Sequence, residues 1–355
     1  MLNYGKNQGL LMIQHSSKAD QATLACASKL FRDLCLPILY RFVALKNSRA
    51  ITSFCSGIIE NPSQADAVRY FALDVPYDTH GIRCDLILAS LKLMLKLDHL
   101  SLSAFTLDPR HAALLLEETH LPQLISCDIW VPADFEDLFQ NISKTSDLAA
   151  VFLTRHSTIK QLYLHSVFRL GASRPGHVSL PNLEFYHGDA VFFLAIDAIS
   201  LTGVQLTWSA ADDIDKIIIK LSSMTKPDLP FVSCHRYRGD PRQIVTSVSK
   251  HMRHTQTLRL QSLRNSSMLL SQQTLLGHIS ECLPRFTNLV YLAIDGAGVS
   301  PTDGERIAVE NWGEACPTLQ ACCLNYQAWE KVDGRWEEYP LKEFWVLAGL
   351  PATYF

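Results

Sequence analysis

The side chains that most suggest recognition chemistry are three arginines, Arg236, Arg238 and Arg259. They alternate with apolar residues in two successive segments, and this spacing predicts neighbouring strands with all three arginines on one face. A guanidinium group presents a planar set of donors that matches a carboxylate or a phosphate. The set therefore predicts a site for an acidic or phosphorylated peptide. The alternative is an ordinary solvated face on which Asp189 or Asp295 balances the arginines.

Other polar side chains stand between the apolar positions of the predicted strands. Because successive residues of a strand point to opposite faces, these side chains belong to the same face as the arginines. They complete the predicted partner-binding set: Tyr163, His165, Gln205 and Gln261.

No motif in the sequence assembles a catalytic centre. Gly296 and Gly298 form a Gly-x-Gly pair, but Pro301 stands where a dinucleotide loop needs its third glycine. His251 and His254 have helical spacing but no third metal ligand close by, so solvated or capping histidines are the better interpretation. Nucleophile-elbow, P-loop and zinc-protease motifs are missing. We expect no enzymatic activity, no cofactor and no metal ion.

Composition and charge exclude several classes of partner. The chain has 355 residues, of which 48% are hydrophobic and 19% charged, and its net charge is −3. This is the composition of a folded protein with no broad attraction to nucleic acid or to an anionic membrane. No segment approaches the roughly 18 apolar residues of a membrane span. The ten cysteines include no C-x-x-C pair, which is typical of buried thiols in a reducing compartment, here the cytoplasm or nucleus.

The residues above are positioned by a repeated strand motif of the form L-x-x-L-x-L. Leu97, Leu100 and Leu102 show it most clearly. The motif recurs roughly every 28 residues, and in the segments around 183–190 and 229–238 its register is ambiguous. Its first positions are Val68, Leu97, Leu124, Ile159, Leu183, Leu201, Val232, Thr255, Leu289 and Leu319.

Helical patterns lie between these strands, for example over Ile82–Leu95 and Ile214–Leu221. Alternating strands and helices fit either a doubly wound sheet or a leucine-rich solenoid. Strands of a doubly wound sheet are buried on both faces, whereas residues between these leucines, such as Ser101 and Gln205, are polar. We therefore predict an α/β leucine-rich-repeat-like solenoid, with parallel strands on the concave side and helices on the convex side.

Both ends of the chain depart from the repeat. The apolar spacing predicts a helix from Asp20 or Gln21 to Leu34, and Pro37 suggests a second short helix over Ile38–Phe42. At the other end, Asp333-Gly334 predicts a β-hairpin turn. A closing helix over Leu341–Leu347 would complete a C-terminal cap, residues 326–355, because a terminal repeat needs one.

Residues 24–45 resemble the last helix and exit of an F-box, as found in fungal F-box and leucine-rich-repeat proteins. The matching positions are Leu24, Cys26, Phe31, Leu34, Pro37, Leu39, Tyr40 and Arg41. The segments LDHLSLS, LPNLEFYHGD and FTNLVYLAIDG also fit that family. The usual Leu-Pro-x-Glu opening of an F-box is replaced by MLNYGKNQGLLMIQHSS, so the resemblance is to an N-terminally truncated F-box.

The resemblance implies an F-box-like segment at residues 1–45 and a solenoid at residues 46–355. It further implies a substrate-recognition adaptor of a Skp–cullin–F-box ubiquitin ligase, with an unidentified protein as substrate. The expected adaptor-binding residues are Leu24, Phe31, Leu34, Pro37, Leu39 and Tyr40. Because the F-box is incomplete, a free-standing interaction scaffold that has lost adaptor binding remains the alternative.

Overall fold

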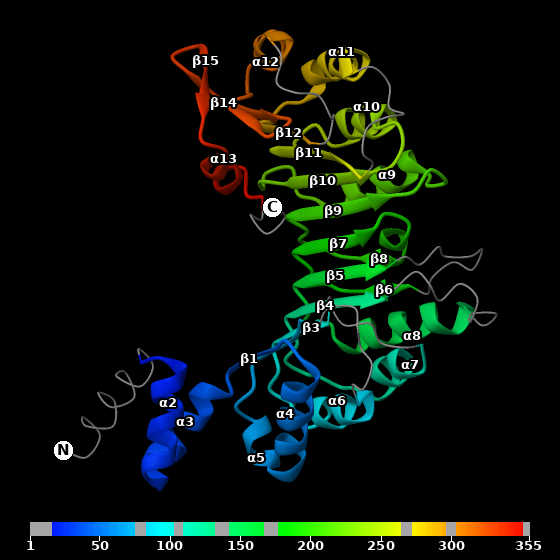
Figure 1. Cartoon of the computed structure of the whole chain (residues 1–355). Helices are drawn as coiled ribbons and strands as arrows, with labels where there is room; N and C mark the ends of the chain where they lie inside the picture. Colours follow the sequence, from blue (N-terminus) through cyan, green and yellow to red (C-terminus); the bar gives the residue numbers. More distant parts are fainter. Residues whose placement is uncertain are drawn as a thin grey trace. The chain divides into compact units, whose positions relative to one another are not determined.

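The computed structural model describes residues 16–74, 83–102, 109–131, 142–166, 177–263, 272–295 and 303–350. The chain forms two compact units, residues 1–180 and 181–355, and each is an α/β structure with a mostly parallel sheet and helices (Figure 1). The boundary predicted at residue 45 lies inside unit 1. There, strand β1 (Phe42–Leu45) pairs with β2 (Tyr70–Leu73).

The sheet of unit 1 is parallel, and its strands follow one another in chain order. After β1 and β2 come β3 (His99–Leu102), β4 (Ser126–Val131) and β5 (Gln161–Ser166). A short strand, β6 (Val178–Ser179), ends the unit. Its helices are α2 (Lys18–Ala27), α3 (Lys29–Leu39), α4 (Ser48–Glu60), α5 (Pro62–Ala65), α6 (Cys84–Leu91), α7 (Pro109–Glu118) and α8 (Ile142–Arg155).

The predicted strand around Leu100 is confirmed. Leu100 and Leu102 are 2% and 1% exposed, whereas His99 and Ser101 are half-buried on the opposite face. Helices α4, α6, α7 and α8 lie side by side against the leucine face (Figure 1). We call this side the helix face and the other side the open face, and use the same terms for the sheet of unit 2.

The N-terminal helices differ from the prediction. The break falls at Ser28, whose side chain accepts a hydrogen bond from the Phe31 amide and so caps α3. Pro37 lies inside the last turn of α3 and does not start a new helix. The predicted helix over Ile38–Phe42 is wrong, because pairing with β2 extends the chain from Phe42 onward.

Unit 2 continues the strand–helix alternation. Its sheet runs in the order β7 (Phe185–Asp189), β9 (Gly203–Trp208), β10 (Val232–Tyr237), β11 (Thr257–Ser262), β12 (Tyr291–Asp295), β13 (Ala321–Leu324), β14 (Gln327–Val332) and β15 (Arg335–Tyr339). The last three strands pair antiparallel. The other elements are β8 (Ile196–Asp197), α9 (Ile214–Met224), α10 (Arg242–His251), α11 (Gln272–Cys282), α12 (Asp303–Ala315), α13 (Leu341–Leu347) and short 3-10 turns at Phe192–Ala195 and Leu283–Arg285.

The repeat register predicted at Val232 is shifted by two residues. Val232 pairs with Thr257, so Ser233 and His235 occupy the two places held by Leu258 and Leu260 in the next strand. The indole N–H of Trp208 donates to His235 Nδ1 at 3.0 Å, and His235 Nε2 lies 2.9 Å from Ser233 Oγ. These bonds satisfy buried polar groups at positions where the other repeats have leucine, and the leucine pattern is therefore degenerate in β10.

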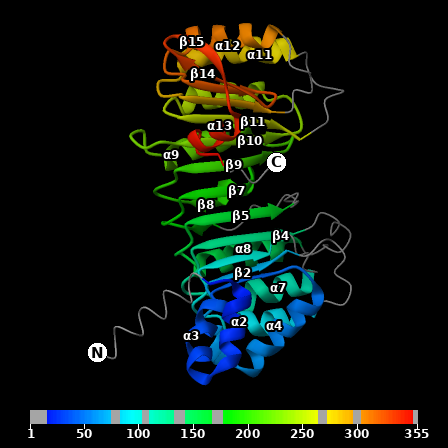
Figure 2. The ribbon, with the colours of Figure 1, turned by 60° about the vertical axis from the view of Figure 1, so that its left-hand side comes forward.

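The predicted C-terminal hairpin and helix are confirmed. Asp333 and Gly334 have φ of 50° and 80°, the conformation of a tight hairpin turn between β14 and β15. Helix α13 then lies on the side of the sheet opposite α9 and α10 (Figures 1 and 2). The C-terminal segment therefore extends the sheet with β14 and β15, and its helix α13 covers part of the open face (Figure 1).

Within the described ranges, no helix is both long and apolar enough to cross a lipid bilayer.

Candidate functional site

The open face of unit 1 is built from two rows of side chains that the parallel register aligns across the strands. The first row runs through Phe42, Tyr70, His99, Ser126 and Gln161. The second row runs through Ala44, Ala72, Ser101, Asp128 and Tyr163. Aligned rows bring side chains from separate repeats within contact distance, because parallel strands lie only about 4.8 Å apart.

An aromatic ladder forms the start of the first row. The rings of Phe42 and Tyr70 stack with centroids 4.0 Å apart and an interplanar angle of 9°. The His99 ring follows at 6.2 Å from Tyr70, and Phe42 remains 50% exposed. The ladder is therefore an ordered aromatic surface open to solvent at its Phe42 end.

Carboxylates lie beside this ladder. Asp98 Oδ1 lies 2.7 Å from His99 Nδ1, and Ser101 Oγ donates to Asp128 Oδ2 at 2.9 Å. Burial raises the pKa of the Tyr70 hydroxyl, and the negative charges of Asp128 and Asp74 raise it further. Asp128 and Asp74 therefore make the electrostatic potential at the Tyr70 hydroxyl more negative.

The open face of unit 2 is closed over by helix α13. Phe344, Trp345 and Ala348 pack against Cys234, Ala293 and Cys323 of the sheet in one buried cluster. The Thr257 hydroxyl also donates to the backbone carbonyl of Ala348 at 2.9 Å. This part of the sheet belongs to the protein core.

Arg259 lies in that core, so the expectation that it is a surface residue is wrong. It is 4% exposed, and its guanidinium pairs with Asp295 Oδ2 through Nε and Nη2, each at 2.7 Å. The Trp345 ring lies over it at 4.5 Å. Burial raises the pKa of the Asp295 carboxyl, although the charge of Arg259 opposes this effect. Asp295 does pair with Arg259, as the alternative interpretation named, but the pair is buried and does not lie on a solvated face.

The remaining predicted residues of unit 2 lie near Arg259 in different environments. Arg236 and Gln261 are register partners in β10 and β11, and both are half-buried. Arg238 follows β10 and is exposed. Gln205 is only 3% exposed, which excludes it from the accessible surface of this unit. The three arginines do not form one exposed cationic site.

Tyr163 and His165 lie in unit 1, so the predicted partner-binding set is divided between the units. Tyr163 is half-buried and stands opposite Asp128 in the second row. The backbone of His165 pairs with Trp130 at the end of β5.

The predicted adaptor-binding residues occupy the helical hairpin α2–α3. Leu24, Leu34 and Leu39 pack, half-buried, around a small core of Ala25 and Cys35. Pro37 is exposed in the last turn of α3. Phe31 is 38% exposed, and its neighbour Leu30, which sequence reasoning missed, is 60% exposed. The hairpin α2–α3 therefore exposes apolar side chains, Leu30 and Phe31, that do not pack into its own core.

Tyr40 links this hairpin to the sheet. Its ring stacks on Phe54 of α4 at 5.8 Å, and Phe54 stacks on Phe71 of β2 at the same distance. Phe71 is fully buried. Tyr40 therefore contacts the first repeat through Phe54.

A separate hollow of about 510 Å3 opens at the N-terminal ends of α9 and α10. Its lining residues are Asp212, Asp213, Ile214, Asp215, Asp240, Arg242, Gln243, Thr246 and His278. The first three aspartates lie at or just before the N-terminal end of α9, where the helix dipole favours negative charge. Asp213 does cap α9, accepting a hydrogen bond from the Lys216 amide at 3.2 Å.

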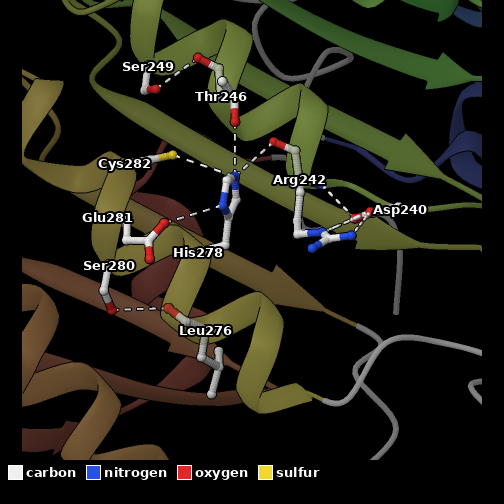
Figure 3. Close-up of polar contacts among 9 residues, drawn as sticks. All are labelled: Asp240, Arg242, Thr246, Ser249, Leu276, His278, Ser280, Glu281 and Cys282. Atoms are coloured by element: carbon white, nitrogen blue, oxygen red, sulfur yellow. Dashed lines mark hydrogen bonds and ion pairs between the residues drawn. The ribbon is translucent and has the colours of Figure 1, made fainter.

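Polar side chains that line this hollow make hydrogen bonds and ion pairs within the protein. Arg242 pairs with Asp240 at 2.7 Å, and although burial raises the pKa of Asp240, the bonds and charge of Arg242 hold it below its ordinary value. His278 Nε2 lies 2.9 Å from the Thr246 hydroxyl and 3.2 Å from the Arg242 carbonyl oxygen (Figure 3). These contacts tie α10 to α11.

Metal and thiol chemistry find no support in the described part of the chain. No group of three or more His, Cys, Asp or Glu residues there could hold a metal ion. His254 Nε2 lies 2.9 Å from the Thr225 hydroxyl, and Gly296 and Gly298 lie outside the described residues. Most cysteines are buried, and burial raises the pKa of Cys234 to about 12, so its thiol is not a nucleophile at neutral pH.

A comparison with models of protein families found no match to this chain, and a comparison with curated proteins found no significantly similar sequence.

Proposed function

We propose that this chain is a non-catalytic, leucine-rich-repeat-like recognition module and acts as the substrate-recognition adaptor of a Skp–cullin–F-box ubiquitin ligase. The observation that carries the proposal is that the strands of unit 1 bury one face against the helices and leave polar and aromatic side chains on the other. Leucines such as Leu100 pack on the helices, while residues such as Tyr70 and Asp128 stand on the open face. A surface assembled from separate repeats suits recognition of a protein.

The hairpin α2–α3 supports the ligase-adaptor part of the proposal. Leu30 and Phe31 are adjacent on α3 and remain exposed, although the hairpin has its own apolar core. Exposed apolar side chains that cluster on one element are typical of protein–protein contacts. In this proposal they contact the Skp-type adaptor, and the sheet binds the substrate.

A second function, a free-standing interaction scaffold, is favoured by the Tyr40–Phe54–Phe71 stack. This stack gives the N-terminal segment a structural task, packing against α4 and β2 of unit 1, that needs no adaptor. The two functions differ in one observable, which is the binding of a Skp-type adaptor.

The test is co-purification of a Skp-type adaptor with the full chain and with variants. We expect the full chain to retain the adaptor and the double variant Leu30→Ala with Phe31→Ala to lose it. Leu95→Ala is the matched control, because Leu95 is 50% exposed in the same unit but outside the hairpin. If the full chain and the double variant both fail to retain the adaptor while remaining folded, the scaffold function replaces the ligase function.

A further inference from the structure

The last strand of the sheet in unit 2 has an edge without a neighbouring strand. Strand β15 pairs with β14 on one side, and no other strand in the described part of the chain pairs with it (Figures 1 and 2). We propose that two copies of this chain associate through this edge. In the pair, β15 of one copy runs antiparallel to β15 of the other about a two-fold axis at Trp336. This inference goes beyond the proposed ligase function and does not depend on it.

The first argument is the direction of the backbone groups of β15. The Lys331 N–H of β14 donates to the Gln320 carbonyl oxygen at 2.8 Å, so the backbone of Lys331 faces β13 and not β15. Trp336 is the register partner of Lys331 in β15. Because hydrogen-bonded and non-hydrogen-bonded pairs alternate in an antiparallel ladder, Trp336 and Glu338 direct their N–H and C=O groups to the outer edge. Such an edge is a template for pairing with another strand.

The second argument is the pair of charged side chains that flank Trp336 in β15. Trp336 is buried beside Gly313 of helix α12. Successive side chains of a strand alternate between its faces, so Arg335 and Glu337 both lie on the opposite face, the open face. Both are exposed, and neither takes part in an ion pair among the described residues. The edge therefore presents one cation and one anion, placed symmetrically about Trp336, to a partner.

The third argument is that a second copy supplies the charge this edge lacks. Glu330 and Glu337 are register partners in β14 and β15, and like charges directly opposite each other destabilise a sheet. Pairing of two copies at Trp336 places Arg335 of each copy opposite Glu337 of the other, so each Glu337 gains an opposite charge. A register centred one residue later would instead place the two copies of Glu337 opposite each other. The charges therefore select the Trp336 register, which is self-complementary, as a two-fold interface requires.

The test measures self-association of the full chain by sedimentation velocity over a range of concentrations. We expect the parent chain to form a dimer as its concentration rises. Arg335→Glu and Glu337→Arg should each weaken the dimer about tenfold, because each turns two opposite-charge pairs between the copies into two like-charge pairs. Arg253→Glu is the matched control and should leave the dimer unchanged, since Arg253 is exposed in the same unit but outside β15. Thermal unfolding of each variant checks that it is folded.

The two substitutions also test the register of the pairing. An equimolar mixture of the Arg335→Glu chain and the Glu337→Arg chain should recover the dimer, because opposite charges then face each other in both pairs. A chain that carries both substitutions should recover it for the same reason. Recovery in the mixture would support the pairing at Trp336. A parent chain that stays monomeric at every concentration, a dimer that neither substitution weakens, or a mixture that stays monomeric would overturn it.

Discussion

The indole ring of Trp345 lies over the guanidinium group of Arg259 at 4.5 Å and seals the Arg259–Asp295 ion pair under helix α13. Trp345 and Asp295, both distant from Arg259 in the sequence, thus enclose this arginine, which was predicted to bind a ligand, in the core. Asp295 is 1% exposed, so neither charge retains access to bulk water. Each buried charge is therefore stabilised by its partner in the ion pair and by helix α13, which covers the pair.

The ion pair makes a prediction about stability. Arg259→Leu should lower the free energy of unfolding by about 3–5 kcal/mol, because it leaves Asp295 buried without its partner. The double variant Arg259→Leu with Asp295→Leu should recover much of this loss, since it removes both charges. Urea unfolding of the two variants and the parent measures the effect. A single variant no less stable than the double one would contradict this dependence.

Glycine 313 tests how closely the tail packs against helix α12. A Cβ atom at this position would lie 2.6 Å from Trp336 Nε1 and 2.7 Å from its Cζ2 atom. Gly313→Ala should therefore destabilise the protein by about 1–3 kcal/mol through overpacking. The matched control is Gly277→Ala in α11, where nothing lies within 4 Å of the new Cβ. That change should stabilise by about 0.5–1 kcal/mol, as expected from helix propensity. The melting temperatures should move in opposite directions.

Histidine 235 predicts sensitivity to acid. Burial lowers its pKa from 6.5 to about 3, so the unfolded chain binds a proton more readily than the folded chain. Stability is thus fully present above pH 6.5 and is lost as the pH falls toward 3. At pH 5 the loss amounts to about 2 kcal/mol.

Unfolding free energies at pH 7.5 and pH 5 measure this contribution. His235→Leu restores the leucine of the repeat and removes the titration, so its stability should fall less between the two pH values. A variant with the same pH dependence as the parent would show that His235 is not the acid-sensitive group.

The strand motif makes a simpler prediction. Leu100→Ala should cost about 2–5 kcal/mol, because it removes buried contacts and leaves a cavity. Leu95→Ala is its control, since Leu95 is 50% exposed and should change stability by no more than about 0.5 kcal/mol. Chemical denaturation distinguishes the two, and similar losses for both would contradict the burial of Leu100 on the helix face of the sheet.

Sequence alone determined the features that depend on short-range order. Leu100 and Leu102 alternate with polar residues, and this alternation is enough to predict a strand with one buried face. Asp333-Gly334 likewise predicts its turn, because the required positive φ angles are a local property of those residues. The capping preference of serine indicates a helix break at Ser28, but the apolar stripe that continues past this residue predicts one uninterrupted helix.

Only the tertiary structure decided which parts of the open face remain accessible. The two-residue period of a strand predicts that Arg259 and Asp128 lie on the face opposite the leucines. It does not predict which other segments pack on that face. Helix α13 reaches Thr257 through Ala348, across 91 positions of the chain, and buries Arg259. The ladder of Phe42, Tyr70 and His99 likewise forms only when the register of three strands aligns residues from separate repeats. Such contacts depend on the relative placement of distant segments, which a local pattern of residues does not encode.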